Sequence, residues 1–201
     1  MRKIVLASAS RRRSEILTSC GIVHVVMPNE IEEIPGGEGP ISEVVELNAI
    51  KKAEFALTVC ETEEDVIIGA DTLVMCGDVV LGKPKNEEEA KAMLRAFSGK
   101  DIFVYTGICV IDALSGRKSV GVDKSEISVT SLKEGDADRY FPLLGPYDKA
   151  GGFSIEGVGA MLFDDIRGSY FNILGLSVVS LKKLFENTGL DLLDFIDRDK
   201  L

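Results

Sequence analysis

The fold is decided by a stretch near the N-terminus, Lys3-Ile4-Val5-Leu6-Ala7-Ser8-Ala9-Ser10-Arg11-Arg12-Arg13. Its apolar first half is typical of a buried strand, and Ser10 is a typical cap for a helix that follows. A helix start offers unpaired backbone N–H groups and a partial positive charge. Two serines and three arginines placed there predict a site for a phosphate-rich anion.

The three arginines cannot all serve one ligand. Successive helix positions point about 100° apart, so we expect two of them to share a ligand and the third to face water. A plain basic helix start is the alternative interpretation of the same residues.

The overall composition restricts the class of partner. The chain has 201 residues, is 45% hydrophobic and carries a formal net charge of −10. This charge argues against a general nucleic-acid or anionic-membrane surface, whereas a small nucleotide needs only one local basic pocket. No apolar run approaches the roughly 20 residues of a membrane span, and the start is too short in apolar residues for a signal peptide. We therefore expect a soluble, cytoplasmic protein with no nucleic-acid or membrane partner.

The cysteines do not indicate a metal or disulfide framework. Four are scattered along the chain with no C-x-x-C pair, and the single histidine, His24, supplies no zinc partner. Four reduced, mostly buried thiols in a cytosolic protein are the expected state.

The rest of the chain alternates strands and helices. Strands are expected at residues 22–27, 65–70, 102–111, 118–130 and 160–166, with a hairpin at 73–81, and helices from residue 42 to about 57 and at 86–97, 134–144 and 178–187. Long hairpins between helices predict a mixed α/β fold rather than a pure doubly wound sheet. With no repeat and no clear linker, residues 1–201 are expected to form one domain with two lobes.

Two acidic positions are candidates for metal or water chemistry. Asp71 follows the apolar strand at 65–70, and open α/β sheets bind ligands beyond the carboxyl ends of their strands. A carboxylate there can hold a divalent cation or activate water, although a turn or cap aspartate is the alternative. Glu32 and Glu33 lie in a glycine-rich acidic loop and can supply a second ligand, unless that loop is merely solvated.

Two lysines are candidates for phosphate binding. Lys52 sits beside Lys51 on the helix from residue 42, so at most one of the two faces a shared site, and a surface lysine is the alternative. Lys83 lies between Gly82 and Pro84, where glycine permits a close approach and proline stiffens the turn.

Six short motifs occur in an order that resembles the Maf family. They are Ser8-Ala9-Ser10-Arg11-Arg12-Arg13, Gly69-Ala70-Asp71-Thr72, Leu81-Gly82-Lys83-Pro84, Tyr105-Thr106-Gly107, Asp148-Lys149-Ala150-Gly151 and Gly168-Ser169-Tyr170. Each is modest alone, but together they cover residues 3 to about 187. Maf proteins are nucleoside triphosphate pyrophosphatases, once described through an effect on septum formation.

The resemblance implies both a fold and a reaction. The implied fold is an elongated mixed sheet with helices on both sides and a central cleft between two lobes, as in inosine triphosphate pyrophosphatases. The implied reaction is an attack of water on the α-phosphorus of a nucleoside triphosphate, which gives the monophosphate and pyrophosphate. It depends on a divalent metal cation, Mg or Mn, and the family implies a homodimer.

The resemblance also assigns roles by position. Phosphate binding falls to Ser8, Arg13, Lys52 and Lys83, and metal binding to Glu33 and Asp71. Asp71 is in addition the implied water-activating base. Arg12, Thr72 and Glu156 fall where the family tunes its base specificity.

Two departures from the family pattern bear on the loop and on specificity. Arg11 stands where the family usually has proline. Glu156 stands where the pyrimidine-preferring branch usually has glutamine, and a carboxylate only accepts hydrogen bonds. Glutamate suits guanine and matches the 7-methyl-GTP branch, whereas Arg12 and Thr72 match the dTTP/UTP branch, which we favour. A 7-methyl-GTP-type or broad-specificity enzyme stays open, as does a non-catalytic nucleotide-binding regulator of cell division.

Overall fold

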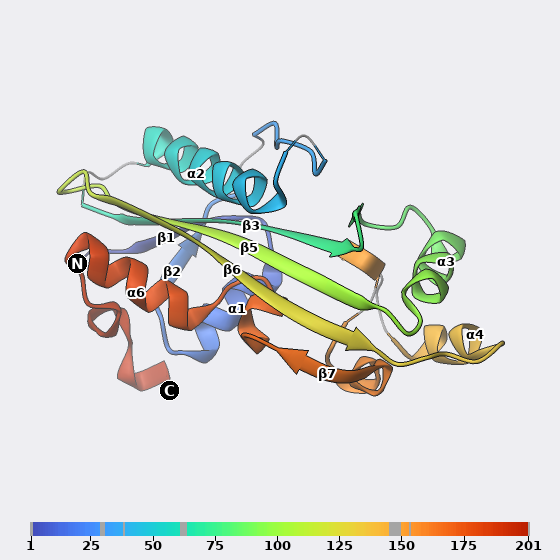
Figure 1. Ribbon diagram of the computed structural model, residues 1–201. Helices are drawn as coiled ribbons and strands as arrows, with labels where there is room; N and C mark the ends of the chain where they lie inside the picture. Colours follow the sequence, from blue (N-terminus) through green and yellow to red (C-terminus); the bar gives the residue numbers. More distant parts are fainter. Residues whose placement is uncertain are drawn as a thin grey trace. The chain divides into compact units, whose positions relative to one another are not determined.

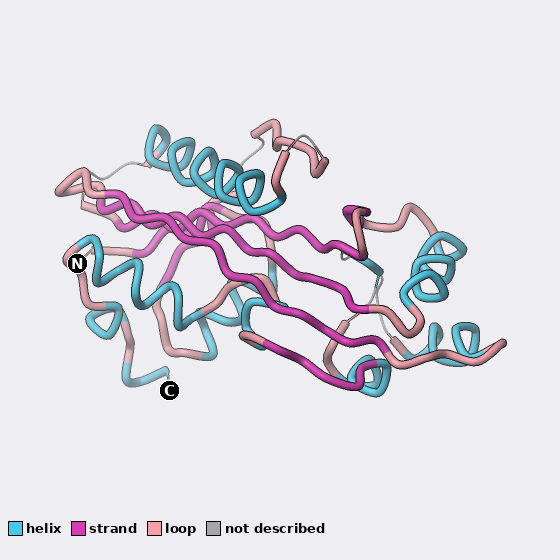
Figure 2. The backbone as a smooth tube through the Cα atoms, in the orientation of Figure 1, coloured by secondary structure: helices cyan, strands magenta, loops and turns pink. Residues whose placement is uncertain are grey.

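The structure is a computed structural model that describes residues 2–28, 31–37, 39–60, 64–144, 150–152 and 154–200. Its seven strands form one sheet in the order β2-β1-β3-β5-β6-β7, with β4 paired to β3 (Figure 1). The strands are β1 Ile4–Ala7, β2 His24–Val26, β3 Val66–Cys76, β4 Val79–Leu81, β5 Asp101–Asp112, β6 Lys118–Val129 and β7 Phe163–Arg167. The α-helices are α1 Arg11–Ser19, α2 Ile41–Val59, α3 Glu87–Phe97, α4 Asp136–Tyr140, α5 Tyr170–Ile173 and α6 Val178–Thr188 (Figure 2).

The sheet is mixed, as the sequence predicts. β1 pairs in parallel with both β2 and β3, whereas β3 pairs with β4 and β6 pairs with β7 in the antiparallel sense. The strand-to-helix start is also confirmed, because β1 leads through residues 8–10 into α1. Ser10 occupies the N-cap position, but its side chain makes no cap hydrogen bond. Its backbone N–H instead donates to Ser8 Oγ at 3.2 Å.

One expected strand boundary is wrong. Residues 65–70 and 73–75 are not separate strands but parts of one strand, β3, so that Asp71 lies inside a strand and not beyond its carboxyl end. The last β1 pair joins Ala7 to Gly69, and β3 then continues to pair with β4 from Val74 onward. Asp71 therefore lies just past the point where the neighbouring strand β1 stops.

The chain divides into two compact units, and the first holds the described residues of 1–72, 105–123 and 169–201. Its core has two faces. Alternate residues of β1, β3 and β5, among them Ile68 and Ala70, pack with α1 and α6 on one face. The intervening residues, among them Ile67, pack with alanines of α2 on the other. Because side chains alternate along a strand, Asp71 lies on the same face as Ile67, toward α2. Thr72 lies on the same face as Ala70, toward α1.

The second unit holds the described residues of 73–104 and 124–168. Asn86 caps α3 by accepting a hydrogen bond from the Glu89 N–H at 2.9 Å. The helix expected at 134–144 is shorter: α4 ends at Tyr140 and a 3-10 turn, Phe141–Leu143, follows. The strand expected at 160–166 begins only at Phe163, because residues 157–162 form a 3-10 helix.

Two glycines allow α2 to lie close to the sheet. A Cβ atom on Gly69 of β3 would lie 2.2 Å from the carbonyl oxygen of Ala49, and one on Gly107 of β5 would lie 2.2 Å from that of Val45. Both contacts would be with helix backbone, which cannot move aside locally. The glycines of two family motifs thus set the distance between the sheet and the helix that carries Lys52.

We expect Gly107→Ala to lower the free energy of unfolding by about 1–3 kcal/mol, the usual cost of overpacking. Urea unfolding measures this difference. Gly121→Ala is the matched strand control, because its added Cβ would meet Leu184 at an ordinary 3.4 Å. Equal losses in the two variants would contradict the close approach of α2 at Gly107.

The structure bears on two expectations, one about membrane spans and one about the cysteines. Among the described residues, no helix combines the length and apolar character that crossing a bilayer requires. The four cysteines are unpaired; Cys109 is buried and the other three are partly buried. Burial raises the pKa of the Cys109 thiol to about 12, so that thiol stays protonated near neutral pH and is a poor nucleophile.

Candidate active site

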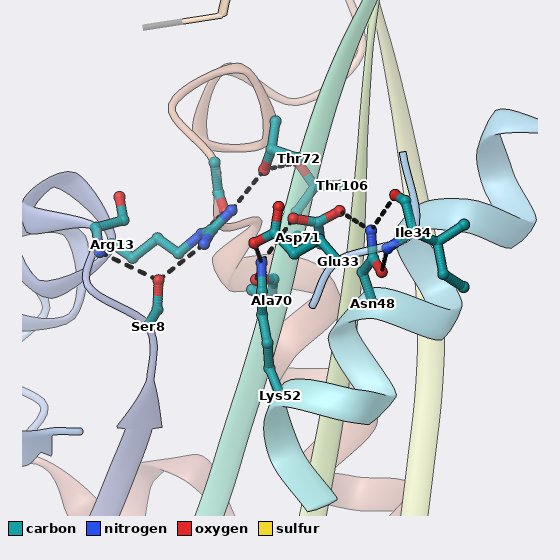
Figure 3. A network of polar contacts seen from close by, with 12 residues as sticks. Ser8, Arg13, Glu33, Ile34, Asn48, Lys52, Ala70, Asp71, Thr72 and Thr106 are labelled. Carbon is teal, nitrogen blue, oxygen red and sulfur yellow. Dashed lines mark hydrogen bonds and ion pairs between the residues drawn. The ribbon is translucent and has the colours of Figure 1, made fainter. Parts of the chain in front are cut away.

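A buried arginine anchors the end of β1. Arg13 donates from Nε to the Gly175 carbonyl at 2.9 Å, from Nη1 to Ser8 Oγ at 2.8 Å and from Nη2 to Thr72 Oγ1 at 2.9 Å (Figure 3). Burial lowers the pKa of Arg13, while the nearby carboxylates of Asp71 and Glu33 act in the opposite direction. These bonds use three of the five N–H donors of a guanidinium, and they fix its position beside the acids.

The other two arginines of the triplet are less buried than Arg13. Arg11 is exposed and pairs with Glu15 at 2.7 Å, whereas Arg12 is half-buried and Arg13 buried. The expected fan of side chains around the helix start is therefore confirmed for Arg11, which faces water. Arg13 is expected to bind phosphate. It also links α1 to Thr72 of β3 and to the backbone carbonyl of Gly175.

Two acids meet at one buried ammonium. Lys52 Nζ lies 2.7 Å from Asp71 Oδ1 and 2.7 Å from Glu33 Oε1. Lys52 and Asp71 are buried, at 6% and 5% exposed, whereas the Glu33 side chain is about half exposed. Lys51 is exposed, so only one of the two consecutive lysines faces the site, as helix geometry requires. Glu32, the other acid of the loop, is exposed.

The site contains one residue that the sequence interpretation missed. Asn48, only 1% exposed, donates from Nδ2 to Asp71 Oδ2 at 3.0 Å and to the Ile34 carbonyl at 3.0 Å. Its Oδ1 accepts from the Ile34 N–H at 2.8 Å. A signal for it exists in the sequence, because Val44, Asn48, Lys52 and Ala56 recur every four residues on the buried face of α2.

A pair of threonine hydroxyl groups extends the network on the other face of β3. Thr72 Oγ1 lies 2.9 Å from Thr106 Oγ1, and Thr106 donates to the Asn172 carbonyl at 3.3 Å. Thr72, expected to tune base specificity, thus also accepts from Arg13 and joins β3 to β5. Ser8, Arg13, Glu33, Lys52, Asp71 and Thr72 all belong to the first unit and are brought together there.

Lys83 and Glu156 belong to the second unit. Lys83 is exposed in the loop after β4, where the Gly82 carbonyl accepts from the Gly151 N–H at 3.1 Å. Glu156 is exposed, and its backbone N–H donates to Ser154 Oγ at 3.2 Å. Asp148 and Lys149 of the fifth motif lie outside the described residues. The parts played by Lys83 and Glu156 in a site remain predictions from the sequence.

The donor set of the acid cluster fits a hard divalent cation. Within the described residues, no group of three or more His, Cys, Asp or Glu side chains could hold a metal ion. Two carboxylates nevertheless converge on one cationic group, Lys52 Nζ. Mg²⁺ is commonly held by one or two carboxylates, with phosphate oxygens of the substrate and water completing the shell. Glu33 and Asp71 are thus suitable ligands for a cation of this class.

Sequence comparisons with known proteins cover nearly the whole chain. A family model described as Maf-like protein matches residues 3–188. A dTTP/UTP pyrophosphatase of Clostridioides difficile is 41% identical over 184 residues, which is 91% of this chain and 93% of the relative. Those of Desulforamulus reducens and Caldicellulosiruptor bescii are 38% and 37% identical, over 96% of this chain in each case and 100% and 98% of the relatives.

Proposed function

The chain belongs to the Maf family, and on that premise we propose that it hydrolyses dTTP and UTP at the α–β phosphate bond to the nucleoside monophosphate and pyrophosphate. Relatives 35–41% identical over nearly the whole chain are named dTTP/UTP pyrophosphatases. The observation that carries the proposal is the pair of acids that bind Lys52. These acids lie near the buried Arg13, at the point where β1 ends.

Asp71 is the base in this proposal. Its two oxygens accept from different donors, Oδ1 from Lys52 and Oδ2 from Asn48. A carboxylate has about four lone-pair sites, so Asp71 can still accept the proton of a water molecule. The water oxygen then bonds to the α-phosphorus, the bond to the bridging oxygen breaks, and pyrophosphate leaves with the electron pair.

The cationic groups bind the polyphosphate. Cleavage between the α and β phosphates builds negative charge on the leaving pyrophosphate, which fixed guanidinium, ammonium and N–H groups stabilise. Arg13, Ser8 and the N-terminus of α1 supply such groups at the end of β1, and Lys52 and Lys83 are the lysines assigned to the same task. Because Arg13 is held by three hydrogen bonds, its orientation is set before the substrate binds.

A divalent cation, Mg or Mn, completes the proposed site. Glu33 and Asp71 would hold it, and it would neutralise phosphate charge and orient the substrate. Lys52 bridges the same two acids. This salt bridge keeps the carboxylates together despite their mutual repulsion.

The test of the proposal is a product assay over a panel of nucleoside triphosphates with Mg²⁺ or Mn²⁺. We expect pyrophosphate and monophosphate, with dTTP and UTP as the best substrates. Orthophosphate as the first product would exclude α–β cleavage. Tight nucleotide binding without turnover across all bases and both metals would support the alternative, a non-catalytic regulator of cell division.

The carboxylate at position 156 favours a second base specificity, for guanine nucleotides. The Glu156 side chain is an exposed carboxylate that can only accept hydrogen bonds, which suits the N1–H and 2-amino groups of guanine. A 7-methyl-GTP-type or broadened preference is the alternative to dTTP and UTP for this reason. Arg12 and Thr72 support the pyrimidine preference by their match to the family pattern.

Glu156→Gln is expected to raise kcat/KM for dTTP and UTP relative to guanine nucleotides, because an amide both donates and accepts. Competition assays with paired substrates measure the ratio. The matched control is Glu134→Gln, which makes the same change in charge at another exposed position of the second unit. A ratio that stays constant in both variants would show that Glu156 does not contact the base.

The family resemblance also supports a homodimer and an inosine triphosphate pyrophosphatase-like fold, and the scattered cysteines support a cytoplasmic location. Light scattering after gel filtration tests the first of these, and a monomeric mass at assay concentration would contradict it.

A further inference from the structure

We propose that Asn48 is a positioning residue that holds the Glu33–Ile34 segment and the Asp71 carboxylate in register, so that both acids meet one cation. Its catalytic consequence rests on the function proposed above, whereas its structural basis does not. The inference starts from three hydrogen bonds made by a single side chain that is almost fully buried.

The orientation of the Asn48 amide follows from its partners. The Ile34 N–H can only donate, so it must face Oδ1, and the Ile34 carbonyl can only accept, so it must face Nδ2. The Asp71 carboxylate also accepts and takes the second N–H of Nδ2. Only a side chain with one acceptor and two donors in one plane satisfies all three partners at once.

The pair of bonds to Ile34 imitates the pairing of one peptide group with another. The Ile34 N–H to Oδ1 distance is 2.8 Å and the Nδ2 to Ile34 carbonyl distance is 3.0 Å. Ile34 follows Glu33 directly, so these bonds fix the backbone from which the Glu33 side chain reaches Lys52. The Glu33–Lys52 ion pair alone would hold this segment only weakly. Glu33 is about half exposed, and an exposed ion pair contributes little to stability.

The position of Asn48 on α2 explains why one residue can serve both acids. Asn48 lies one helical turn before Lys52 on the same buried face. Lys52 binds Asp71 at Oδ1, and Asn48 binds it at Oδ2, so the two helix residues fix the plane of the carboxylate between them. Residues that orient metal-binding carboxylates in this way commonly change metal affinity or activity by about 10–100-fold when replaced.

Asn48→Leu is the decisive variant, because leucine matches the branching of asparagine but makes no hydrogen bond. We expect amide hydrogen exchange at Ile34 to become at least about tenfold faster, since its acceptor is removed. We also expect the dissociation constant for Mn²⁺, titrated by electron paramagnetic resonance with α,β-methylene-UTP present, to rise by about 10–100-fold. The kcat for dTTP should fall by a similar factor, while KM at saturating metal changes less.

Asn48→Ala is the second variant should leucine disturb packing, and Val44→Ala is the matched control. Val44 lies one turn earlier on the same face of α2 and is 3% exposed, but it has no polar group in the network. Its substitution is expected to lower stability and to leave Ile34 exchange, Mn²⁺ affinity and kcat near the wild-type values. The control thus separates loss of the network from general loosening of α2.

The outcomes separate the two proposals. Unchanged Ile34 exchange in Asn48→Leu, or faster exchange with unchanged Mn²⁺ affinity, would overturn the role of Asn48. A wild-type protein that binds no Mn²⁺, with or without α,β-methylene-UTP, would overturn it as well, because the two acids would then hold no metal. Slow Ile34 exchange and tight Mn²⁺ binding that both depend on Asn48, without any pyrophosphate release, would support this inference and overturn the proposed function.

Discussion

Replacing Asp71 by asparagine is expected to lower kcat for dTTP by at least about 10²-fold, the lower end of what a general base contributes. Asparagine keeps the size of the side chain but loses the charge and the capacity to take a proton from water. Lys52 would also lose its buried anionic partner. Steady-state release of pyrophosphate at saturating dTTP and metal measures the effect.

The matched control for this variant is Asp112→Asn. Asp112 is 4% exposed, close to the 5% of Asp71, and it is likewise bound to a cation, here Arg2, in the first unit. Burial raises the pKa of Asp112, but hydrogen bonds from Ser115 and Arg2 outweigh this and leave it below its usual range. Its substitution should cost stability at neutral pH without loss of kcat. Full activity of Asp71→Asn would remove Asp71 from the base role.

Lys52→Met is expected to cause the largest loss of stability, about 3–5 kcal/mol in the free energy of unfolding. Methionine retains most of the apolar length of lysine but leaves the buried Asp71 carboxylate without its counter-charge. Most of the loss arises from that carboxylate and not from Glu33, which is half exposed. Urea unfolding followed by circular dichroism measures it, and pyrophosphate release should fall in parallel.

Two further variants make this prediction specific. Lys51→Met changes the adjacent, exposed lysine of α2 and should be nearly neutral. The double variant Lys52→Met/Asp71→Asn should be more stable than Lys52→Met alone, because neither member of the buried Lys52–Asp71 pair is then left charged without the other. A Lys52→Met protein as stable as the wild type, or a double variant less stable than both single variants, would contradict the buried ion pair.

Part of the fold and the site follows from the sequence because local patterns determine it. The apolar run at residues 4–7 and the polar residues after it suffice to place β1 and α1. The angular rule for helices correctly limits the interior to at most one of Lys51 and Lys52. Both depend only on spacing within one element.

Other parts depend on what lies beside an element. The length of β3 does not follow from its own residues, because its pairing with β1 ends at Gly69 and the strand continues with β5 and β4 as its neighbours. That continuation turns the expected strand-end aspartate into a strand residue, whose alternation then directs Asp71 to α2 and Thr72 to Arg13. The role of Asn48 could not be predicted from the sequence for the same reason, because its partners, Ile34 and Asp71, lie 14 and 23 residues away along the chain.

The most direct test of the proposed chemistry is hydrolysis of dTTP in H₂¹⁸O, with mass analysis of both products. If water bound by Asp71 attacks the α-phosphorus, one ¹⁸O atom enters the monophosphate and none enters pyrophosphate. Label found in pyrophosphate, with unlabelled monophosphate, would show attack at the β-phosphorus and contradict the arrangement proposed here.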